Sequence, residues 1–224
     1  MLEETHWEKA AKTRMGKYLT RIETDFISKF VDLSKLNLVV DVGAEAGRFS
    51  LLAANKKVSV VGVDIDLYSL RRLKQKNKDV TVIQADARKL PLKDGLFNAL
   101  FMIEVIDYIP ESDAVLSECS RILKPDSPIV FSFGNQSSFK AKLKGIRGKS
   151  YMHSYKTIMH SMQAVGLTIT GKVGYSWLPF GRTSENSLVN LFAGVEKIFG
   201  LRKVPSLSPW VIISAKSSPA NYTP

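Results

Sequence analysis

Along much of this 224-residue chain, short apolar runs alternate with longer segments whose apolar residues recur every three or four positions. Short runs rich in β-branched residues are typical of buried strands, and the longer periodic segments are typical of amphipathic helices. The predicted strands cover residues 38–41, 58–64, 80–84, 98–103 and 129–133. The predicted helices cover residues 3–32, with a break expected around Gly16, and then 47–55, 67–77 and 111–123. This alternation indicates βαβ units and a parallel sheet.

The C-terminal part has a different order of elements. The predicted elements are a helix over 154–165, a strand over 167–173, a helix over about 185–199 and a strand over 210–215. We interpret the two strands as an antiparallel edge hairpin with a long insertion. The fold class that follows is α/β, with a Rossmann-like, doubly wound, seven-stranded sheet that is mostly parallel and has an antiparallel C-terminal edge strand.

The whole chain, 1–224, is predicted to form one domain, because its length and its 45% hydrophobic content suit a single core of this class. Within this domain we expect three parts. They are an N-terminal helical lid (1–35), a cofactor-binding core (36–133), and a substrate-side region with the C-terminal hairpin (134–224).

The segment LVVDVGAEAGRFS at 38–50 predicts a strand that feeds a tight turn and then a helix. Glycines at 43 and 47 let backbone N–H groups approach a ligand closely, and the helix that follows offers unpaired donors. The dinucleotide fingerprint G-x-G-x-x-G fails here, because Glu45 and Arg48 occupy its second and third glycine positions. Since a glutamate would repel a pyrophosphate, a ligand without phosphate and with a cationic end fits better.

Acidic residues stand at or just past the ends of three successive predicted strands, namely Asp41, Asp64 and Asp86. Ligands of doubly wound sheets sit at the carboxyl ends of the strands. A carboxylate after the second strand suits ribose hydroxyls, and one after the third can accept from an exocyclic amine such as that of adenine. Asp41 can hold the turn or meet a ligand ammonium group.

The ordered set of motifs resembles the class I S-adenosylmethionine (SAM) methyltransferases. DVGAEAG at 41–47 is similar to the family's first motif, D/E-x-G-x-G-x-G. The similarity continues through VVGVDID (60–66), QADARKLPLKDGLFNALF (84–101) and SECSRILKPDSPIVFS (117–132), and the tail resembles the family's last helix and hairpin. Within the family, the chain looks closest to the small-molecule group that includes quinone-biosynthesis enzymes.

The resemblance implies SAM as cofactor and assigns residues to its parts. Asp41, Gly43 and Gly47 would frame the methionine end, and Met102, Ile103 and Glu104 would line the sulfonium region. Asp64 would hold the ribose hydroxyls. Ile65 would lie against the adenine ring, and Asp86 and Ala87 would bind the adenine edge. Glu45 replaces the motif's middle glycine, which would cost on the order of 1 kcal/mol at a positive φ. We therefore predict that Glu45 keeps a negative φ and either turns to solvent or faces the ammonium group of SAM.

Methyl transfer needs a general base only when the nucleophile is protonated and weak. The candidates near the expected cavity mouth are His153, Tyr108 and Asp107, and no metal site is expected. His6 and Trp7 are candidates for an N-terminal lid.

The formal net charge of +11 favours anionic partners, and residues 134–150 carry five basic residues and no acid. The predicted acceptor is a small molecule, for which this charge favours an anion. Methylation of RNA or protein is an alternative, although the chain has no N-P-P-F/Y tetrad and no RNA-binding module. A SAM-binding protein without catalysis is another alternative, because of Glu45 and the lack of an evident base.

Three further features of the sequence bear on location. The N-terminus has acidic residues and no apolar core of a signal peptide, and no apolar run approaches the roughly 20 residues of a membrane span. The single cysteine, Cys119, excludes an internal disulfide framework. We therefore expect a cytoplasmic protein.

Overall fold

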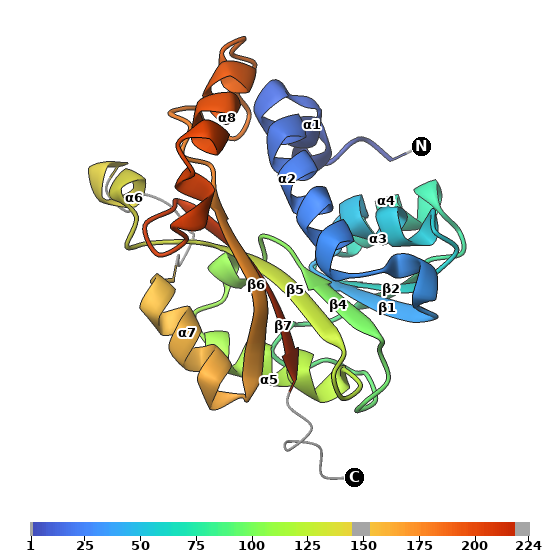
Figure 1. Cartoon of the computed structure of the whole chain (residues 1–224). Helices are drawn as coiled ribbons and strands as arrows, with labels where there is room; N and C mark the ends of the chain where they lie inside the picture. Colours follow the sequence, from blue (N-terminus) through green and yellow to red (C-terminus); the bar gives the residue numbers. More distant parts are fainter. Residues whose placement is uncertain (1, 145–152, 218–224) are drawn as a thin grey trace.

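The computed structural model describes residues 2–144 and 153–217, which form one seven-stranded sheet covered by helices (Figure 1). The strands are β1 (Leu38–Val42), β2 (Ser59–Asp64), β3 (Thr81–Gln84), β4 (Ala99–Met102), β5 (Pro128–Gly134), β6 (Leu167–Tyr175) and β7 (Trp210–Ser217). The α-helices are α1 (His6–Lys12), α2 (Arg14–Phe30), α3 (Arg48–Ala54), α4 (Leu67–Lys76), α5 (Ser112–Ile122), α6 (Phe139–Lys144), α7 (Tyr155–Ala164) and α8 (Val189–Ile198). Short 3₁₀ turns are η1 (Leu33–Lys35), η2 (Ile106–Tyr108) and η3 (Leu201–Lys203).

The strand order is β3-β2-β1-β4-β5-β7-β6. The first five strands pair in parallel, and β7 runs antiparallel between β5 and β6. The insertion predicted between the last two strands is present and holds α8. The predicted fold class is confirmed, with β6 at the edge of the sheet and the reversed strand β7 one place further in.

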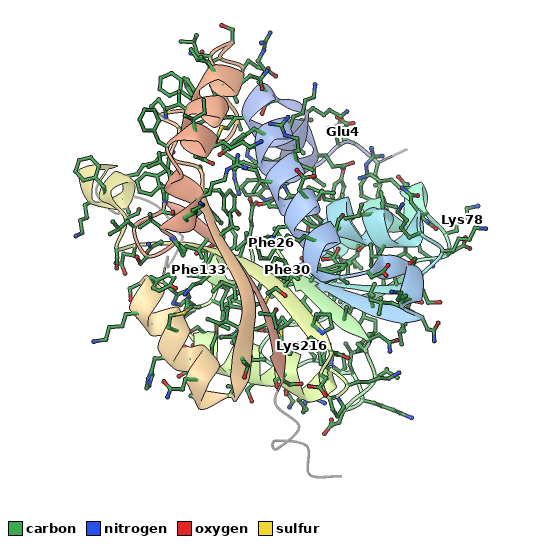
Figure 2. The ribbon with its side chains drawn as sticks, viewed as in Figure 1. Glu4, Phe26, Phe30, Lys78, Phe133 and Lys216 are labelled. Atoms are coloured by element: carbon green, nitrogen blue, oxygen red, sulfur yellow. The ribbon has the colours of Figure 1, made fainter. Side chains whose placement is uncertain are left out.

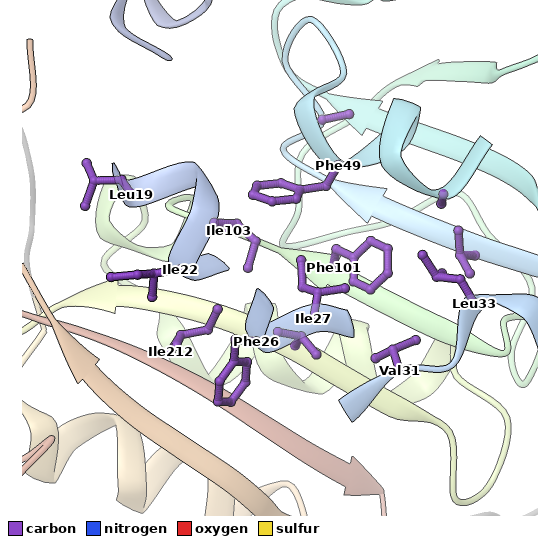
Figure 3. Packing of buried hydrophobic residues seen from close by; sticks show 14 of the residues in the cluster. Leu19, Ile22, Phe26, Ile27, Val31, Leu33, Phe49, Phe101, Ile103 and Ile212 are labelled. Atoms are coloured by element: carbon purple, nitrogen blue, oxygen red, sulfur yellow. The ribbon is translucent and has the colours of Figure 1, made fainter. Parts of the chain in front are cut away.

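Apolar side chains fill both faces of the sheet. On one face, α2, α3 and α8 pack against the strands, and α5 and α7 cover the other face. Figure 3 shows the first layer, in which Ile27 of α2 lies beside Phe101 of β4 and Ile22 lies toward Ile212 of β7. Most of the apolar stripe predicted for the N-terminal helix is therefore buried against the sheet.

The break in the N-terminal helical region lies at Thr13, three residues before Gly16. Thr13 ends α1, and its side chain caps α2 by accepting from the Gly16 amide at 3.0 Å. Gly16 is needed for a different reason, because a Cβ there would lie 2.0 Å from the carbonyl oxygen of Ala10. The glycine thus allows α1 to fold closely back on α2.

The helices around the carboxyl ends of the strands begin at defined caps. Thr5 and Glu8 form a reciprocal capping box at the start of α1. The Asp66 carboxylate accepts from the amides of Tyr68 (3.1 Å) and Ser69 (3.2 Å) and so begins α4 directly after β2. These caps fix where α1 and α4 stand beside the end of the sheet.

Within the described residues, no helix is long and apolar enough to cross a bilayer.

Candidate functional site

A cavity of about 960 Å³ opens at the carboxyl ends of β1, β2 and β4. Its walls come from the turn after β1, the loops after β2 and β3, the segment from Ile103 to Glu111, helices α1 and α2, and Arg182. The volume lies near the upper end of the range for small-molecule sites, which leaves room for two ligands side by side. The location is the one that the sheet topology predicts.

The turn after β1 has two residues with positive φ on the cavity side. Gly43 has φ 73°, and a Cβ there would lie 2.1 Å from a methyl carbon of Val105, so no larger residue fits. Glu45 has φ 49°. The prediction that Glu45 keeps a negative φ is therefore wrong, because the turn retains the conformation of a glycine turn after the middle glycine is replaced.

The Glu45 side chain lines the cavity instead of pointing away from it. Its Oε2 accepts a hydrogen bond from the Ala46 amide, while Oε1 is buried and has no hydrogen-bond partner among the described residues. The Glu45 amide donates to Oδ2 of Asp64 at 2.8 Å. A buried carboxylate oxygen without a donor is costly, so the site favours a ligand group that donates to it.

Asp41 and Gly47 shape the turn from outside the cavity wall. The buried Asp41 carboxylate accepts from the Ser50 hydroxyl at 2.6 Å, and burial raises its pKa to about 6 against the effect of that hydrogen bond. Gly47 begins α3 with φ 93°, and a Cβ there would lie 2.3 Å from a methyl carbon of Leu73. Asp41 therefore holds α3, and Gly47 lets α3 pack closely on α4.

Asp64, Ile65 and Ala87 all line the cavity as predicted. Asp64 accepts from the amides of Glu45 and Asp66, the latter at 2.9 Å, so its carboxylate is held rigidly at the end of β2. Ile65 is 70% exposed, which is unusual for an isoleucine beside a polar turn. It offers an apolar surface next to the carboxylate, as a nucleoside requires.

Asp86 also lines the cavity, but Arg88 occupies its carboxylate. Arg88 Nη2 lies 2.6 Å from Asp86 Oδ2, and this arginine also bonds to Glu111 at 3.2 Å. Hydrogen bonds from the Arg88 side chain and amide lower the pKa of Asp86. An exocyclic amine would have to share the Asp86 carboxylate with Arg88.

Of the three predicted catalytic candidates, only Tyr108 lines the cavity. Burial, together with the nearby Asp107 charge, raises the pKa of Tyr108. Asp107 is buried, accepts from the Gly134 amide at 2.8 Å, and has a pKa raised by burial to about 7. His153 Nε2 lies 3.1 Å from the carbonyl oxygen of Ile106 and 2.9 Å from that of Ile109. Asp107 and His153 therefore hold the segment that presents Tyr108.

Met102 is also outside the cavity lining. It is fully buried, and its Sδ lies 4.0 Å from Sγ of Cys119 on the side of the sheet that α5 covers. The next two residues, Ile103 and Glu104, do line the cavity. Because alternate residues of a strand point to opposite faces, a one-residue difference separates core from site here.

Beyond β4, four charged side chains form a cluster, of which sequence reasoning identified only Glu104. Glu104 has φ 65°, and its carboxylate pairs with Arg182 and with Arg48, the latter at 3.4 Å. Arg48 also pairs with the fully buried Glu23 at 3.1 Å. Burial lowers the pKa of Arg182 to about 10. Two cations face two carboxylates, so the cluster has no net charge.

Helix α1, which belongs to the predicted lid, lines the cavity, and two sets of contacts hold it in place. The Arg182 guanidinium carbon lies 5.1 Å from the centre of the Trp7 ring and 4.8 Å from that of Trp210. On the other side, Glu8 pairs with Arg72 (3.1 Å) and Lys76 (2.6 Å) of α4. No motif indicates these pairs, because their members come from four separate segments.

Comparison with known proteins places this geometry in a family. Residues 40–131 match the family described as "Methyltransferase domain". A ubiquinone biosynthesis O-methyltransferase from Chromobacterium violaceum is 25% identical over 152 residues, which are 65% of this chain and 64% of the relative. 24-methylenesterol C-methyltransferase 2 from Arabidopsis thaliana is 24% identical over 182 residues, 73% of this chain and 50% of the relative. The chain thus matches less than two thirds of the length of either relative.

Among solved structures, the [4+2]-cyclase SpnF superposes with a TM-score of 0.70 at 15% identity, covering 97% of this chain and 86% of that one. This similarity concerns the fold alone. The family match over residues 40–131 and the curated relatives support the predicted family, the class I SAM-dependent methyltransferases, whose cofactor is SAM.

Proposed function

We propose that the cavity binds SAM and that the protein transfers the SAM methyl group to a small-molecule acceptor. The observation that carries this proposal is the shape of one cavity. Asp64, the exposed Ile65 and the glycine turn stand at one end, Glu104 and Arg182 stand at the other, and helix α1 reaches both. One end suits a nucleoside with an amino-acid tail, and the other leaves space for a second molecule.

The fit to SAM rests on the residues of the turn and the next strand end. The Asp64 carboxylate is positioned to accept from ribose hydroxyls, and Ile65 with Ala87 would border the adenine. The partnerless Oε1 of Glu45 would accept from the ammonium group of the methionine end. SAM would supply an electrophilic methyl group on a sulfonium, whose sulfur departs as a neutral thioether, so the protein mainly positions the acceptor and excludes water.

On the acceptor side we assign roles to Tyr108 and to the lid. Tyr108 is the predicted base candidate that reaches the cavity, although its raised pKa means that it acts as a hydrogen-bonding group at neutral pH. Because Arg48 and Arg182 of the cavity wall are balanced by Glu104 and by the buried Glu23 behind the wall, the cavity favours a neutral acceptor over the anion suggested by the overall charge. The relatives named for ubiquinone and methylenesterol chemistry support an apolar acceptor with a ring system.

The direct test is calorimetric titration of the protein with SAM, comparing the natural chain with Asp64→Ala. Loss of a carboxylate that accepts from two hydroxyls should weaken binding by at least about 100-fold, since each charge-assisted hydrogen bond contributes about 1.5–3 kcal/mol. Asp79→Ala, which removes an exposed carboxylate outside the cavity lining, is the matched control and should bind normally. Failure of the natural chain to bind millimolar SAM would refute the proposal.

SAM binding without methyl transfer is the second candidate, and the occupied Asp86 carboxylate favours it. Arg88→Ala would release Asp86. A gain in SAM affinity of at least about tenfold, with no methylated product from quinol- or sterol-like acceptors before or after the change, would support this candidate. Methylated product detected by mass spectrometry from the natural chain would exclude it.

Methylation of RNA stays an alternative that rests on the basic segment 134–150. Three of its five cations lie in α6, and the other two, Arg147 and Lys149, lie outside the described residues. A steep fall of RNA affinity with rising salt would support it.

A further inference from the structure

The face of α8 that points away from the rest of the molecule is apolar. Exposed large apolar residues recur at helical spacing along it and just before and after it: Leu188, Leu191, Phe192, Val195, Ile198 and Phe199. Ile198 is 83% exposed, Phe199 73% and Leu191 62%. Figure 2 shows side chains, several with rings, projecting from α8 on the side away from α1 and α2. A stripe of this size on a surface helix marks an interaction site.

The orientation of α8 about its own axis is fixed by a buried polar residue on the opposite face. Glu196 is 1% exposed, and its carboxylate accepts from the Tyr18 hydroxyl (2.6 Å), the Trp177 amide (3.1 Å) and Arg202 Nε (2.8 Å). Rotating the helix to bury its apolar stripe would pull this carboxylate from all three donors. The fold therefore holds the apolar face outward.

The exposed charged side chains along and after α8 are all basic, and the exposed acid just before it, Glu185, lies 4.0 Å from Arg14. Residues 186–209 contain three basic residues and one acid, and that acid is the buried Glu196, already paired with Arg202. Lys197 and Lys203 are exposed beside the apolar stripe. Helix α6 lies in the same region, and two contacts connect it to α8. Lys140 Nζ donates to the carbonyl oxygen of Leu178 at 2.6 Å. Two residues further on, the Phe180 ring contacts the ring of Phe192 in α8. Helix α6 adds the exposed Phe139 and Lys142.

We propose that the outer face of α8 and the neighbouring α6 seat the protein on an anionic lipid membrane surface. An apolar helical face bordered by lysines is the pattern of helices that lie in the membrane interface, with the apolar side chains among the acyl chains and the lysines near the lipid phosphates. A second copy of the chain fits the same face poorly. Pairing two α8 faces would bring Lys197 and Lys203 of both copies together without an exposed acid in residues 186–209 to neutralise them.

The proposed membrane-binding face of α8 lies next to the cavity, since the chain runs from Arg182 in the cavity wall directly into the turn before α8. Figure 1 shows α8 beside α1, the lid helix, at the same end of the molecule. Binding to the surface would therefore place the lid end of the cavity near the membrane. The membrane proposal does not depend on methyl transfer, and it holds or fails separately from SAM binding.

The test is flotation of the full chain with vesicles of phosphatidylcholine alone and of equimolar phosphatidylcholine and phosphatidylglycerol. We expect binding to the mixed vesicles that weakens with added salt, and little binding to the neutral ones. The double variant Ile198→Ser/Phe199→Ser should bind mixed vesicles at least about tenfold more weakly, because it removes the two most exposed apolar side chains. Lys197→Gln/Lys203→Gln should weaken binding about fivefold for each lysine.

Leu96→Ser is the matched control, since Leu96 is 37% exposed in the turn before β4, at the opposite end of the sheet from the cavity. It should bind vesicles as the natural chain does. Unchanged melting temperatures and SAM titrations would show that all variants are folded. Equal binding to neutral and anionic vesicles, or undiminished binding by Ile198→Ser/Phe199→Ser, would overturn the proposal. A concentration-dependent dimer that this double variant abolishes, without vesicle binding, would identify the face as an interface between copies instead.

Discussion

The two ends of the cavity are held together in different ways. At the nucleoside end, carboxylates accept from backbone amides, as when Asp64 accepts from Glu45 and Asp66. At the acceptor end, a carboxylate is held by side chains that are distant in sequence, as in the pairs of Glu104 with Arg182 and Arg48. Backbone donors are supplied by any residue, whereas side-chain donors require particular residues. The nucleoside end should therefore tolerate substitution of its neighbours better than the acceptor end.

The largest expected effect is on stability, at Glu196, a buried carboxylate outside the cavity lining that is also held by residues distant in sequence. Glu196→Ala leaves the Tyr18 hydroxyl, the Trp177 amide and Arg202 without their acceptor in the interior. We expect the free energy of unfolding in urea to fall by about 3–5 kcal/mol, as for other buried charges that lose a partner. Asp94→Ala breaks the pair with Arg121 at a carboxylate that is 69% exposed, and should cost less than about 1 kcal/mol. Similar losses in the two variants would mean that burial and long-range side-chain donors do not set the cost of losing a carboxylate.

The same difference explains what the sequence could predict. The order of strands and helices, the cavity position and the presence of Asp64 and Ile65 in its wall follow from periodicity and from local motifs, which are properties of neighbouring residues. Asp107 and His153 were chosen by residue type near the expected mouth. Whether a side chain enters a cavity or supports it from behind depends on tertiary contacts that type does not encode. The prediction that Met102 lines the cavity is wrong by one position, because the face to which a strand residue points can be predicted only when the exact end of the strand is known.

The pairings of Arg182 with Glu104 and Trp7 are beyond sequence reasoning for a stronger reason. Arg182 lies in the insertion between β6 and β7, whose path is set by Glu196 and by the packing of α8 on α2. No periodic pattern places that insertion over the cavity. The prediction for Glu45 is wrong for a different reason. The residue type predicts a negative φ, whereas the surrounding turn imposes a positive one.

The next largest effect is on the pH dependence of stability, through Asp107. Burial raises its pKa to about 7, so the folded protein binds this proton more tightly than the unfolded chain, in which the pKa is near 4. The free energy of unfolding should therefore fall as the pH rises from about 4 to about 7, and level off above that. In Asp107→Asn, which keeps an acceptor for the Gly134 amide, this fall should shrink by up to a few kcal/mol, measured by urea unfolding across pH.

Glu8 provides a comparison of opposite sign for that measurement. Burial opposes its ionisation, but hydrogen bonds from Lys76, the Thr5 amide and Arg72 outweigh burial and lower the pKa to about 2. Its contribution to stability is present above about pH 4.5 and is lost as the pH falls toward 2. Glu8→Gln should therefore alter only the acid side of the profile. A neutral-side change in Glu8→Gln, or an unaltered profile in Asp107→Asn, would contradict these assignments.

A smaller effect is expected where the two ends meet, at the lid. Arg182→Leu removes the guanidinium from between Trp7 and Trp210, while Glu104 keeps Arg48 as partner. We expect a loss of about 1–3 kcal/mol in stability and faster tryptic cleavage after Lys9 and Lys12 in α1, since a desolvated cation–π contact is worth up to about 2 kcal/mol. Arg14→Ala, which breaks the exposed 4.0 Å pair with Glu185, is the control. Cleavage unchanged in Arg182→Leu would mean that the Glu8 pairs alone hold the lid.

The smallest expected effect separates two roles of Glu45 at the nucleoside end. If its partnerless Oε1 accepts from the ammonium group of SAM, Glu45→Gln should weaken SAM binding about fivefold to tenfold, because one charge-assisted hydrogen bond becomes a neutral one. Glu45→Gly should weaken it similarly while relieving about 1 kcal/mol of strain at φ 49°. Calorimetry gives the affinity, and thermal unfolding gives the strain. Tighter SAM binding by both variants would show that the Glu45 carboxylate instead competes with SAM for the Ala46 amide. The Glu45 side chain would then partly block the cofactor site in the natural protein.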